Sequence, residues 1–346
     1  MSLFSTLCVV CVTIFACFVF YIATYNRNMS LFVNLYSFGM YVYTRYMLGE
    51  GKEEDKKRFM RIRSHMMKDK DVIIHREGVV ATRVPVTVRD GTIINMYVYT
   101  PASAITDGRR RPLLFFCHGG GWVFANRWNA EPVLTDYVLA TDSVLVYVDY
   151  RLAPEFTHPT ASNDCYDCLK YVREHAETFH VDLERVVLFG DSAGGQIACV
   201  IVQTALEEFH RNLFRRLVLI YPAMESRAIP DEEYTWEERN LIYENTWGFP
   251  YKVGAIMAEW YFVKEENVLS PVGSPVFIED YSGFPETVMF TNEYDALRIP
   301  ARTAYEKMKK CGLNVKYVCV KNAVHALWGS KRNTLGYNDL VLKELK

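Results

Sequence analysis

Short apolar runs recur along the chain between about residue 84 and residue 320. The runs are rich in β-branched, aromatic and leucine side chains, a composition that favours strands. We therefore predict eight strands, at 84–89, 93–99, 113–117, 143–149, 186–190, 217–221, 287–291 and 315–320. Helix-length segments separate most of the runs, a pattern that indicates a mostly parallel sheet with helices on both faces. The first two runs are instead joined through Asp90 and Gly91, which predict an antiparallel hairpin.

The chain begins with an uncharged apolar run over residues 3–24. These roughly 22 residues are long enough to span a hydrocarbon core of about 30 Å as a helix. A cleaved signal peptide is the alternative, but no basic segment precedes the run and no small-x-small cleavage site lies before Tyr25. We therefore expect residues 1–25 to form an uncleaved transmembrane anchor.

Two other segments predict helices outside the sheet. Residues 31–48 are aromatic and apolar but interrupted by polar positions, which suggests a helix lying against lipid. Residues 224–271 are aromatic and acidic with few strand signals. We expect residues 26–75 and the insertion at about 224–271 to form a helical cap over a domain that spans 76–346. The insertion could also be a helical pair with only a packing role.

Composition limits the function. A chain of 346 residues, half of them hydrophobic, can bury a large core. A net charge of -2 argues against nucleic acid as a partner, because phosphate binding needs a strongly basic surface. The chain contains no phosphate loop and no dinucleotide fingerprint, so no cofactor is expected. Cys165-x-x-Cys168 lacks a second ligand pair and is interpreted as one helix face, so no metal is expected either.

The string Gly190-Asp191-Ser192-Ala193-Gly194 fits the Gly-x-Ser-x-Gly pattern of a nucleophile elbow. A β-like run precedes it, and an apolar segment that can form a buried helix follows. In such an elbow the serine lies on a sharp, exposed corner between strand and helix. We predict Ser192 as a nucleophile, with an ordinary glycine-rich turn as the alternative.

A second string, His118-Gly119-Gly120-Gly121-Trp122, follows the apolar run at 113–117. Consecutive glycines allow backbone N–H groups to approach a developing oxyanion, whose stabilisation is a large contribution to acyl transfer. We assign the oxyanion hole to Gly119, Gly120 and Gly121 together with Ala193. Among these, Gly119 is expected to shape the turn and the other three to donate their amides, while His118 supports the loop.

Together with Tyr150-Arg151-Leu152-Ala153-Pro154-Glu155, these strings resemble the hormone-sensitive-lipase-type branch of the α/β-hydrolases. Within that branch the likeness is greatest to the arylacetamide deacetylase and neutral cholesterol ester hydrolase group, over about residues 84–330. The resemblance implies an α/β-hydrolase fold with eight strands and a helical cap. It also implies a serine esterase or lipase that acts on neutral lipophilic esters, and on aryl amides as a further substrate class.

The remaining catalytic residues follow from the family's chain order of nucleophile, acid and histidine. Asp295 follows the run at 287–291 in an Asp-x-Leu-Arg setting and resembles the family acid, with Glu293 as the alternative. His325 is the only histidine after Asp295. The family commonly continues with acidic residues after this motif, whereas here Pro300 follows and is expected to begin a helix.

Orientation in the membrane is predicted differently by charge and by resemblance. Positive charges at Arg27, Arg45 and residues 52–70 follow the apolar run and favour a cytosolic domain. The resemblance implies a single-pass type II protein of the endoplasmic reticulum with a lumenal domain. We expect the lumenal orientation, because large domains translocate against a weak charge bias.

Three functional classes compete at this point. A serine carboxylic-ester hydrolase would use a small lipophilic ester as substrate and lie against membrane lipid. A non-catalytic small-ligand receptor on the same fold would lack a member of the triad, yet Ser192, Asp295 and His325 are all present. A membrane-anchored structural protein would leave both glycine motifs unexplained. The sequence therefore favours the enzyme.

Overall fold

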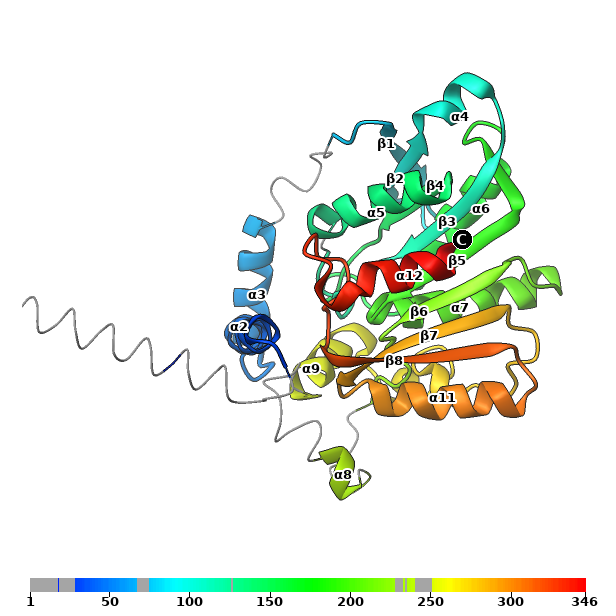
Figure 1. The fold of residues 1–346 in the computed structure, drawn as a ribbon. Helices are drawn as coiled ribbons and strands as arrows, with labels where there is room; N and C mark the ends of the chain where they lie inside the picture. Colours follow the sequence, from blue (N-terminus) through cyan, green and yellow to red (C-terminus); the bar gives the residue numbers. More distant parts are fainter. Residues whose placement is uncertain are drawn as a thin grey trace, which may run out of the picture.

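A computed structural model describes residues 18, 29–66, 75–125, 127–227, 233, 235–239 and 251–346 of the chain. Its centre is an eight-stranded sheet in the order β1-β2-β4-β3-β5-β6-β7-β8 (Figure 1). The strands are β1 (Val79–Thr87), β2 (Ile93–Pro101), β3 (Arg111–Cys117), β4 (Val144–Asp149), β5 (Val181–Asp191), β6 (Arg216–Ile220), β7 (Glu286–Tyr294) and β8 (Val315–Val324). β2 is antiparallel to both of its neighbours, β1 and β4, and the other strand pairs are parallel. The predicted mostly parallel sheet and its opening hairpin are confirmed.

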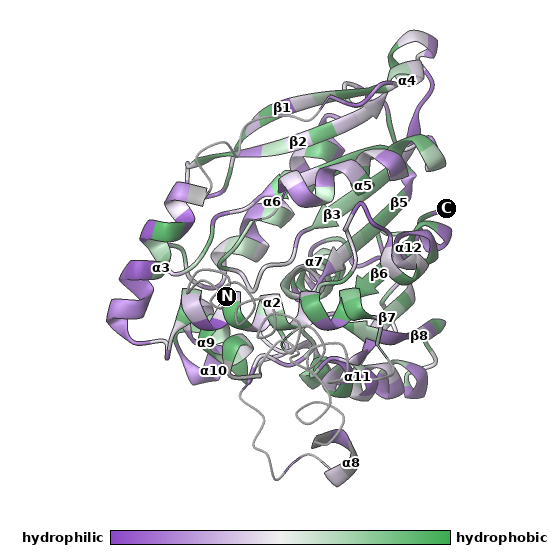
Figure 2. Cartoon of the chain, turned by 60° about the vertical axis from the view of Figure 1, so that its left-hand side comes forward, coloured by the Kyte–Doolittle hydropathy of each residue, from purple (hydrophilic) through white to green (hydrophobic). Residues whose placement is uncertain are grey.

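Helices cover both faces of the sheet because its strands are apolar on both sides. In β3, Leu113 and Phe115 belong to one buried cluster, whereas Leu114 and Phe116 belong to the other. The first cluster includes residues of α6 (Thr160–Glu174), α7 (Ala193–Phe209) and α11 (Arg298–Lys310), and the second includes residues of α5 (Arg127–Thr141) and α12 (Tyr337–Leu345). Figure 2 shows the hydrophobic colouring of the central strands. Two-sided burial is typical of parallel sheets.

Further helices lie outside these two layers. They are α2 (Leu31–Leu48), α3 (Glu53–Met66), α4 (Ala102–Asp107), α8 (Trp236–Arg239), α9 (Tyr251–Phe262) and α10 (Glu265–Val268), with short 3-10 turns at Pro275–Phe277 and Thr334–Gly336. Helix α2 begins at Ser30, whose hydroxyl accepts a hydrogen bond from the Val33 amide at 3.3 Å. It packs against α3, α9 and β8 (Figure 1). The N-terminal helices therefore lie beside the cap insertion.

Parts of the predicted anchor and cap fall outside the described residues. Of residues 1–25, only Phe18 is described, and its ring contacts Phe38 of α2 edge-on with the centroids 5.2 Å apart. Within the insertion at 224–271, residues 228–232, 234 and 240–250 also lie outside. Among the residues that the structure does describe, no helix has both the length and the apolar character needed to cross a membrane.

Helix α11 begins two residues before the expected position. Its first residue is Arg298, and Pro300 is the third. The chain turns into the helix directly after Asp295, whose backbone carbonyl accepts a hydrogen bond from the Arg298 amide at 3.1 Å. A proline in the first turn costs no helical hydrogen bond, because the amide at that position has no partner within the helix.

Candidate active site

Ser192 lies at the corner between β5 and α7, in a backbone conformation that L-residues seldom adopt. Its φ is 54° and its ψ is -120°. Two glycines make the corner possible: a Cβ at Gly190 would overlap the carbonyl oxygen of Gly194, and a Cβ at Gly194 would overlap that of Cys117. The Ser192 amide donates to the Ile220 carbonyl at 2.9 Å. Strain of this kind persists only where the surroundings hold it, and it is common at functional sites.

The structure brings the three predicted triad residues together in one hydrogen-bonded line. The Ser192 hydroxyl lies 3.0 Å from His325 Nε2, and His325 Nδ1 lies 2.7 Å from Asp295 Oδ2. The three side chains come from the ends of β5, β7 and β8, and each is less than a tenth exposed. This order of hydroxyl, imidazole and carboxylate is the arrangement that activates a serine nucleophile.

Asp295, rather than Glu293, contacts the histidine. Its second oxygen accepts a hydrogen bond from the Leu297 amide at 3.0 Å, which fixes the carboxylate. Glu293 instead accepts from Lys321 Nζ at 2.8 Å and from the Asn322 amide at 3.0 Å. Glu293 still belongs to β7, whereas Asp295 lies one residue past the end of the strand, in the turn that leads to α11. The regular alternation of strand side chains therefore does not extend to Asp295, and of the two carboxylates only that of Asp295 reaches His325.

The segment Gly119–Phe124, here called the glycine loop, lies beside Ser192. Its residues Gly120, Gly121 and Trp122 all have positive φ angles, of 108°, 59° and 62°. Among the described residues, the amides of Gly120 and Gly121 have no acceptor. The Ala193 amide is the first of α7 and has no acceptor within its helix. These three donors can therefore bind a negatively charged oxygen.

Gly119 has a different role from its neighbours. Its amide donates to Asp191 Oδ1 at 2.7 Å and so is not available as an oxyanion donor. This contact agrees with the expectation that Gly119 shapes the turn of the glycine loop while its neighbours donate their amides. Desolvation raises the pKa of the partly buried Asp191 to about 6, an increase that the Gly119 amide and the charge of His325 oppose.

His118 supports the glycine loop through a contact with its first residue, Gly119. Its ring stacks on those of Tyr147 and Tyr150, at centroid distances of 5.1 Å and 4.0 Å. Its Nδ1 lies 2.7 Å from the Gly119 carbonyl, which must accept the hydrogen bond. Burial lowers the pKa of His118 to about 4, so its imidazole is neutral at physiological pH. The residue is therefore placed for support rather than for proton transfer at Ser192.

Two cavities meet at Ser192. The larger has a volume of about 810 Å³ and is lined by His325, by residues of α2 such as Tyr36 and Met40, and by Met257 of α9. The smaller, of about 50 Å³, is lined mainly by small residues, among them Ala193, Ala223, Gly254, Ala255 and Ala258. Gly121, Ser192 and Met257 border both cavities, whereas His325 borders only the larger one. Met257 therefore lies at the boundary between them.

Sequence reasoning did not single out three residues at this site. Tyr36 donates its hydroxyl to the Ala326 carbonyl at 2.7 Å, next to the candidate histidine. Arg63 reaches the glycine loop from α3, and Met257 covers Gly121. All three come from cap helices, where no local motif signals a role. In the described ranges, no three His, Cys, Asp or Glu side chains gather in an arrangement suited to a metal ion.

Comparison with known proteins gives a consistent picture. Residues 114–329 match the protein family described as the alpha/beta hydrolase fold. The chain is 27% identical over 218 residues to an α/β-hydrolase protein of Acanthamoeba polyphaga mimivirus, which covers 62% of this chain and 61% of that protein. It is 26% identical over 237 residues to an arylesterase of Saccharolobus solfataricus, with 68% and 74% covered. It is 25% identical over 317 residues to arylacetamide deacetylase of Bos taurus, with 73% and 77% covered.

A solved structure extends the likeness to three dimensions. The chain resembles a thermostable carboxylesterase cloned from a metagenomic library, with a TM-score of 0.72 and 27% sequence identity over 83% of this chain and 96% of that chain. The chain spans less than two thirds of the length of the mimivirus protein. The segment matched to the family, 114–329, contains every candidate residue from His118 to His325.

Proposed function

This chain belongs to the α/β-hydrolase fold family, and from that premise we propose that it hydrolyses lipophilic carboxylic esters through a covalent acyl-enzyme. Esterases recur among its relatives and structural neighbours, and the chain is a serine carboxylic-ester hydrolase of this kind. The observation that carries the mechanism is the line from Ser192 through His325 to Asp295, beside amides without acceptors.

Acylation begins when His325 Nε2 takes the proton of Ser192 and the Oγ attacks the ester carbonyl. The carbonyl oxygen becomes an oxyanion, which the amides of Gly120, Gly121 and Ala193 stabilise. One such donor contributes about 3 kcal/mol to the transition state. Asp295 holds the Nδ1–H tautomer of His325 and stabilises the imidazolium that forms.

The intermediate collapses when His325 returns its proton to the oxygen of the leaving alcohol. The C–O bond of the ester breaks, and the acyl group stays on Ser192. Water then attacks the acyl-enzyme with His325 again as the base, releasing the acid and regenerating the serine. The same residues thus act in both halves of the reaction.

The two cavities suggest which part of the substrate lies where. The leaving oxygen must meet His325 Nε2, and His325 borders only the cavity of about 810 Å³. The alcohol portion is therefore assigned to that cavity and the acyl group to the cavity of about 50 Å³. That smaller volume suits a short acyl group such as acetyl. The proposed substrate is thus a short-chain acyl ester of a bulky apolar alcohol, with aryl amides of the same shape as a second class.

Placement in the arylacetamide deacetylase and neutral cholesterol ester hydrolase group is part of this proposal. It is supported by the sequence motifs and by 25% identity to the bovine deacetylase. With it we propose a type II anchor over residues 1–25 in the endoplasmic reticulum membrane and a lumenal catalytic domain. Protease protection of the domain in intact microsomes tests this orientation, and digestion of the domain from the outside would reverse it.

Hydrolysis of p-nitrophenyl acetate by the purified protein tests the proposed reaction. Ser192→Ala is expected to abolish turnover and covalent labelling by a fluorophosphonate, because both require the serine oxygen. Undiminished turnover in that variant would exclude the mechanism. A folded wild-type protein that binds apolar esters without hydrolysing them would favour the ligand-receptor alternative.

The acid of the triad is tested by a matched pair of variants. Asp295→Asn should lower kcat by about 10⁴-fold, since an amide favours the wrong histidine tautomer. Glu293→Gln should leave kcat close to the wild-type value, because Glu293 contacts Lys321 and Asn322 instead. The opposite result would assign the role of the acid to Glu293.

A further inference from the structure

Arg63 of α3 is a buried cation that spans two segments of the catalytic domain. Only 7% of the surface of this residue is exposed. Nη1 donates to the carbonyl of Val123 at 2.8 Å and to that of Ala153 at 2.6 Å. Nη2 lies 2.5 Å from both carboxylate oxygens of Glu155. A single guanidinium therefore joins the glycine loop to the segment 150–155.

The glycine loop requires external contacts to keep its shape. Three consecutive positive φ angles, at Gly120, Gly121 and Trp122, are costly, and the cost is greatest at Trp122 because it carries a Cβ. The Gly120 carbonyl accepts from the Val123 and Phe124 amides at 3.1 Å and 2.9 Å, which closes the turn. Arg63 then binds the carbonyl of Val123 at the end of that same turn. It thereby contacts the part of the loop whose orientation sets the direction of the Gly120 and Gly121 amides.

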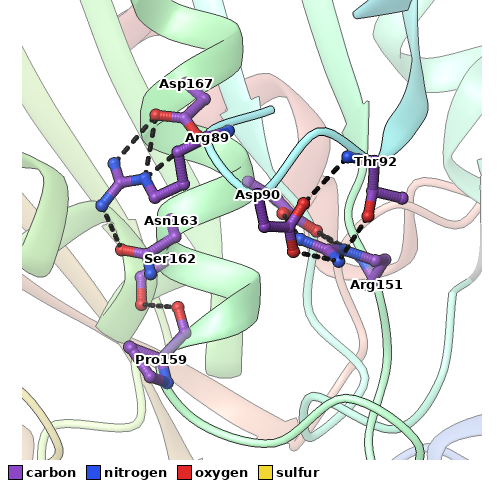
Figure 3. Close-up of polar contacts among 9 residues, drawn as sticks. Arg89, Asp90, Thr92, Arg151, Pro159, Ser162, Asn163 and Asp167 are labelled. Carbon is purple, nitrogen blue, oxygen red and sulfur yellow. Dashed lines mark hydrogen bonds and ion pairs between the residues drawn. The ribbon is translucent and has the colours of Figure 1, made fainter. Parts of the chain in front are cut away.

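The segment on the other side of Arg63 is itself held firmly. Arg151 pairs with Asp164 of α6 at 2.7 Å. It also pairs with Asp90 in the β1-β2 turn at 2.7 Å (Figure 3). The Ala153 amide donates to the Trp122 carbonyl at 2.9 Å. Arg63 therefore links the glycine loop to a fixed support rather than to a second loose loop.

Helix α3 contacts the same loop through an apolar side chain one turn earlier. Phe59 packs edge-on against Phe124, with the centroids 4.8 Å apart. The guanidinium of Arg63 lies 5.3 Å from the Phe59 ring centroid. Residues 59 and 63 are four apart and share one helix face. The hydrogen bond of Arg63 and the aromatic contact of Phe59 therefore reach the same end of the glycine loop, at Val123 and Phe124.

We propose that Arg63 is a positioning residue for the oxyanion hole, acting on the Gly120 and Gly121 amides through the Val123 carbonyl. The inference rests on the proposed esterase function. It assigns to a cap helix a part in the chemistry, because a donor displaced by even 1 Å loses most of its effect on a transition state. An arginine suits this role because its planar fork can serve two carbonyls and a carboxylate at once.

The test compares Arg63→Met, Arg63→Lys and Glu155→Gln with the wild-type chain on p-nitrophenyl acetate. Arg63→Met is expected to lower kcat roughly 10- to 100-fold while KM changes less than about threefold. The reason is that the affected hydrogen bonds stabilise the oxyanion of the transition state more than the bound ester. The inhibition constant of a trifluoromethyl ketone, whose bound form places an oxyanion in the hole, should rise in parallel. Lysine should restore only part of the activity, since one ammonium cannot make the same set of contacts.

Arg111→Met is the matched control. Arg111 is also a buried arginine, 3% exposed and paired with Asp107 and Asp142, but it lies at the other end of β3 from the glycine loop. The Arg111→Met variant should have a lower melting temperature than the wild type but the same kcat per labelled active site. Added methylguanidinium should raise the kcat of Arg63→Ala and leave that of Arg111→Ala unchanged.

The outcomes separate the inference from the proposed function. A wild-type chain that neither turns over esters nor reacts with a fluorophosphonate would refute the function itself. An active wild type with unchanged kcat and ketone affinity in Arg63→Met would overturn the role of Arg63 alone. If Arg63→Met does not fold, Arg63→Lys and Glu155→Gln decide: a parallel loss of kcat and ketone affinity supports the role, and wild-type values for both refute it.

Discussion

Asp191, the residue before the nucleophile, is partly buried and holds its carboxyl group against the backbone of the glycine loop. Its Oδ1 accepts from the Gly119 amide at 2.7 Å, and a Cβ at Gly119 would collide with the Asp191 side chain. The glycine and the aspartate therefore fit one another. Burial disfavours the carboxylate and raises its pKa from 3.8 to about 6. This cost of ionisation makes the stability of the fold depend on pH.

A raised carboxyl pKa means that the folded protein keeps a proton which the unfolded chain has already lost. Between pH 4 and 6 the folded state therefore binds more protons at Asp191 than the unfolded state does. The contribution of Asp191 to the free energy of unfolding falls as the pH rises through this window and is constant above it. Relative to Asp191→Asn, the wild type should lose on the order of 3 kcal/mol of unfolding free energy between pH 4 and 7. Urea unfolding of both proteins at several pH values measures this difference.

Other titrating groups cancel in that comparison because both proteins contain them. Asparagine can still accept a hydrogen bond from the Gly119 amide, so the contact itself survives the substitution. Parallel stability curves for the two proteins would show that Asp191 ionises with an ordinary pKa. Activity is not needed for this measurement, so it is independent of the proposed reaction.

At the level of single residues, the sequence predicts the members of the site better than their contacts. Motif and chain order are enough to select Ser192 and His325. The sequence leaves the choice between Asp295 and Glu293 open, because it depends on which of the two carboxylates is directed toward His325 at the end of β7. Arg63 is not predicted at all, because its carbonyl partners carry no sequence signal. Only the fold brings residues 63, 123 and 153 together.

Among the elements, α9 determines the shape of the site most directly. Met257 lies over Gly121 so closely that a Cβ there would overlap its sulfur, and it borders both cavities. The small cavity of about 50 Å³ ends against this side chain. Helix α9 thus separates the proposed acyl site from the proposed alcohol site.

Met257→Ala is expected to shift the preference of the enzyme toward longer acyl groups. Loss of the side chain would join the cavities, and each additional methylene buried contributes about 0.8 kcal/mol. The ratio of kcat/KM for p-nitrophenyl hexanoate to that for the acetate should rise about tenfold or more. Met308→Ala, a buried methionine of α11 that borders neither cavity, is the control and should leave this ratio unchanged. An unchanged ratio in both variants would remove Met257 from the specificity of the site.

The sequence predicts the strands more reliably than their ends. All eight predicted runs lie within or overlap observed strands, because apolar side chains on both faces give a strong signal. Strand β1 begins five residues earlier than expected, at Val79 instead of 84, and pairs there with Pro101 of β2. It lies at the edge of the sheet and is largely exposed, so polar residues in it obscure the strand pattern.

On the scale of the whole molecule, the larger cavity is assembled from residues between Tyr36 and Lys331, nearly the full described length. The sequence predicts a cap, but not which side of each helix faces the cavity. In α2 one side of the helix faces the cavity, through Tyr36, Met40 and Tyr43. The exposed apolar side chains of the same helix are Leu31, Leu35, Val42 and Tyr46, which are 44%, 39%, 47% and 65% exposed.

The exposed side chains of α2 are spaced so that they form one stripe along the helix. A helix with one face on the cavity and an apolar stripe on the other can rest on a membrane while admitting a substrate dissolved in it. This fits the proposed anchor, because only residues 25–30 separate the uncharged run at 3–24 from α2. We therefore expect the stripe to matter for substrates in lipid and not for substrates in water.

Leu35→Glu combined with Val42→Glu tests that expectation in the full-length chain. Two charges at an apolar membrane contact should lower the hydrolysis of an ester embedded in phospholipid vesicles about tenfold or more. Turnover of water-soluble p-nitrophenyl acetate should be unchanged, because neither side chain borders the cavity. Glu substitutions at Val80 and Ile93, exposed apolar residues of β1 and β2, are the control and should affect neither substrate. An equal loss on both substrates would indicate damage to the site, and full activity on vesicles would show that α2 does not meet the membrane through this stripe.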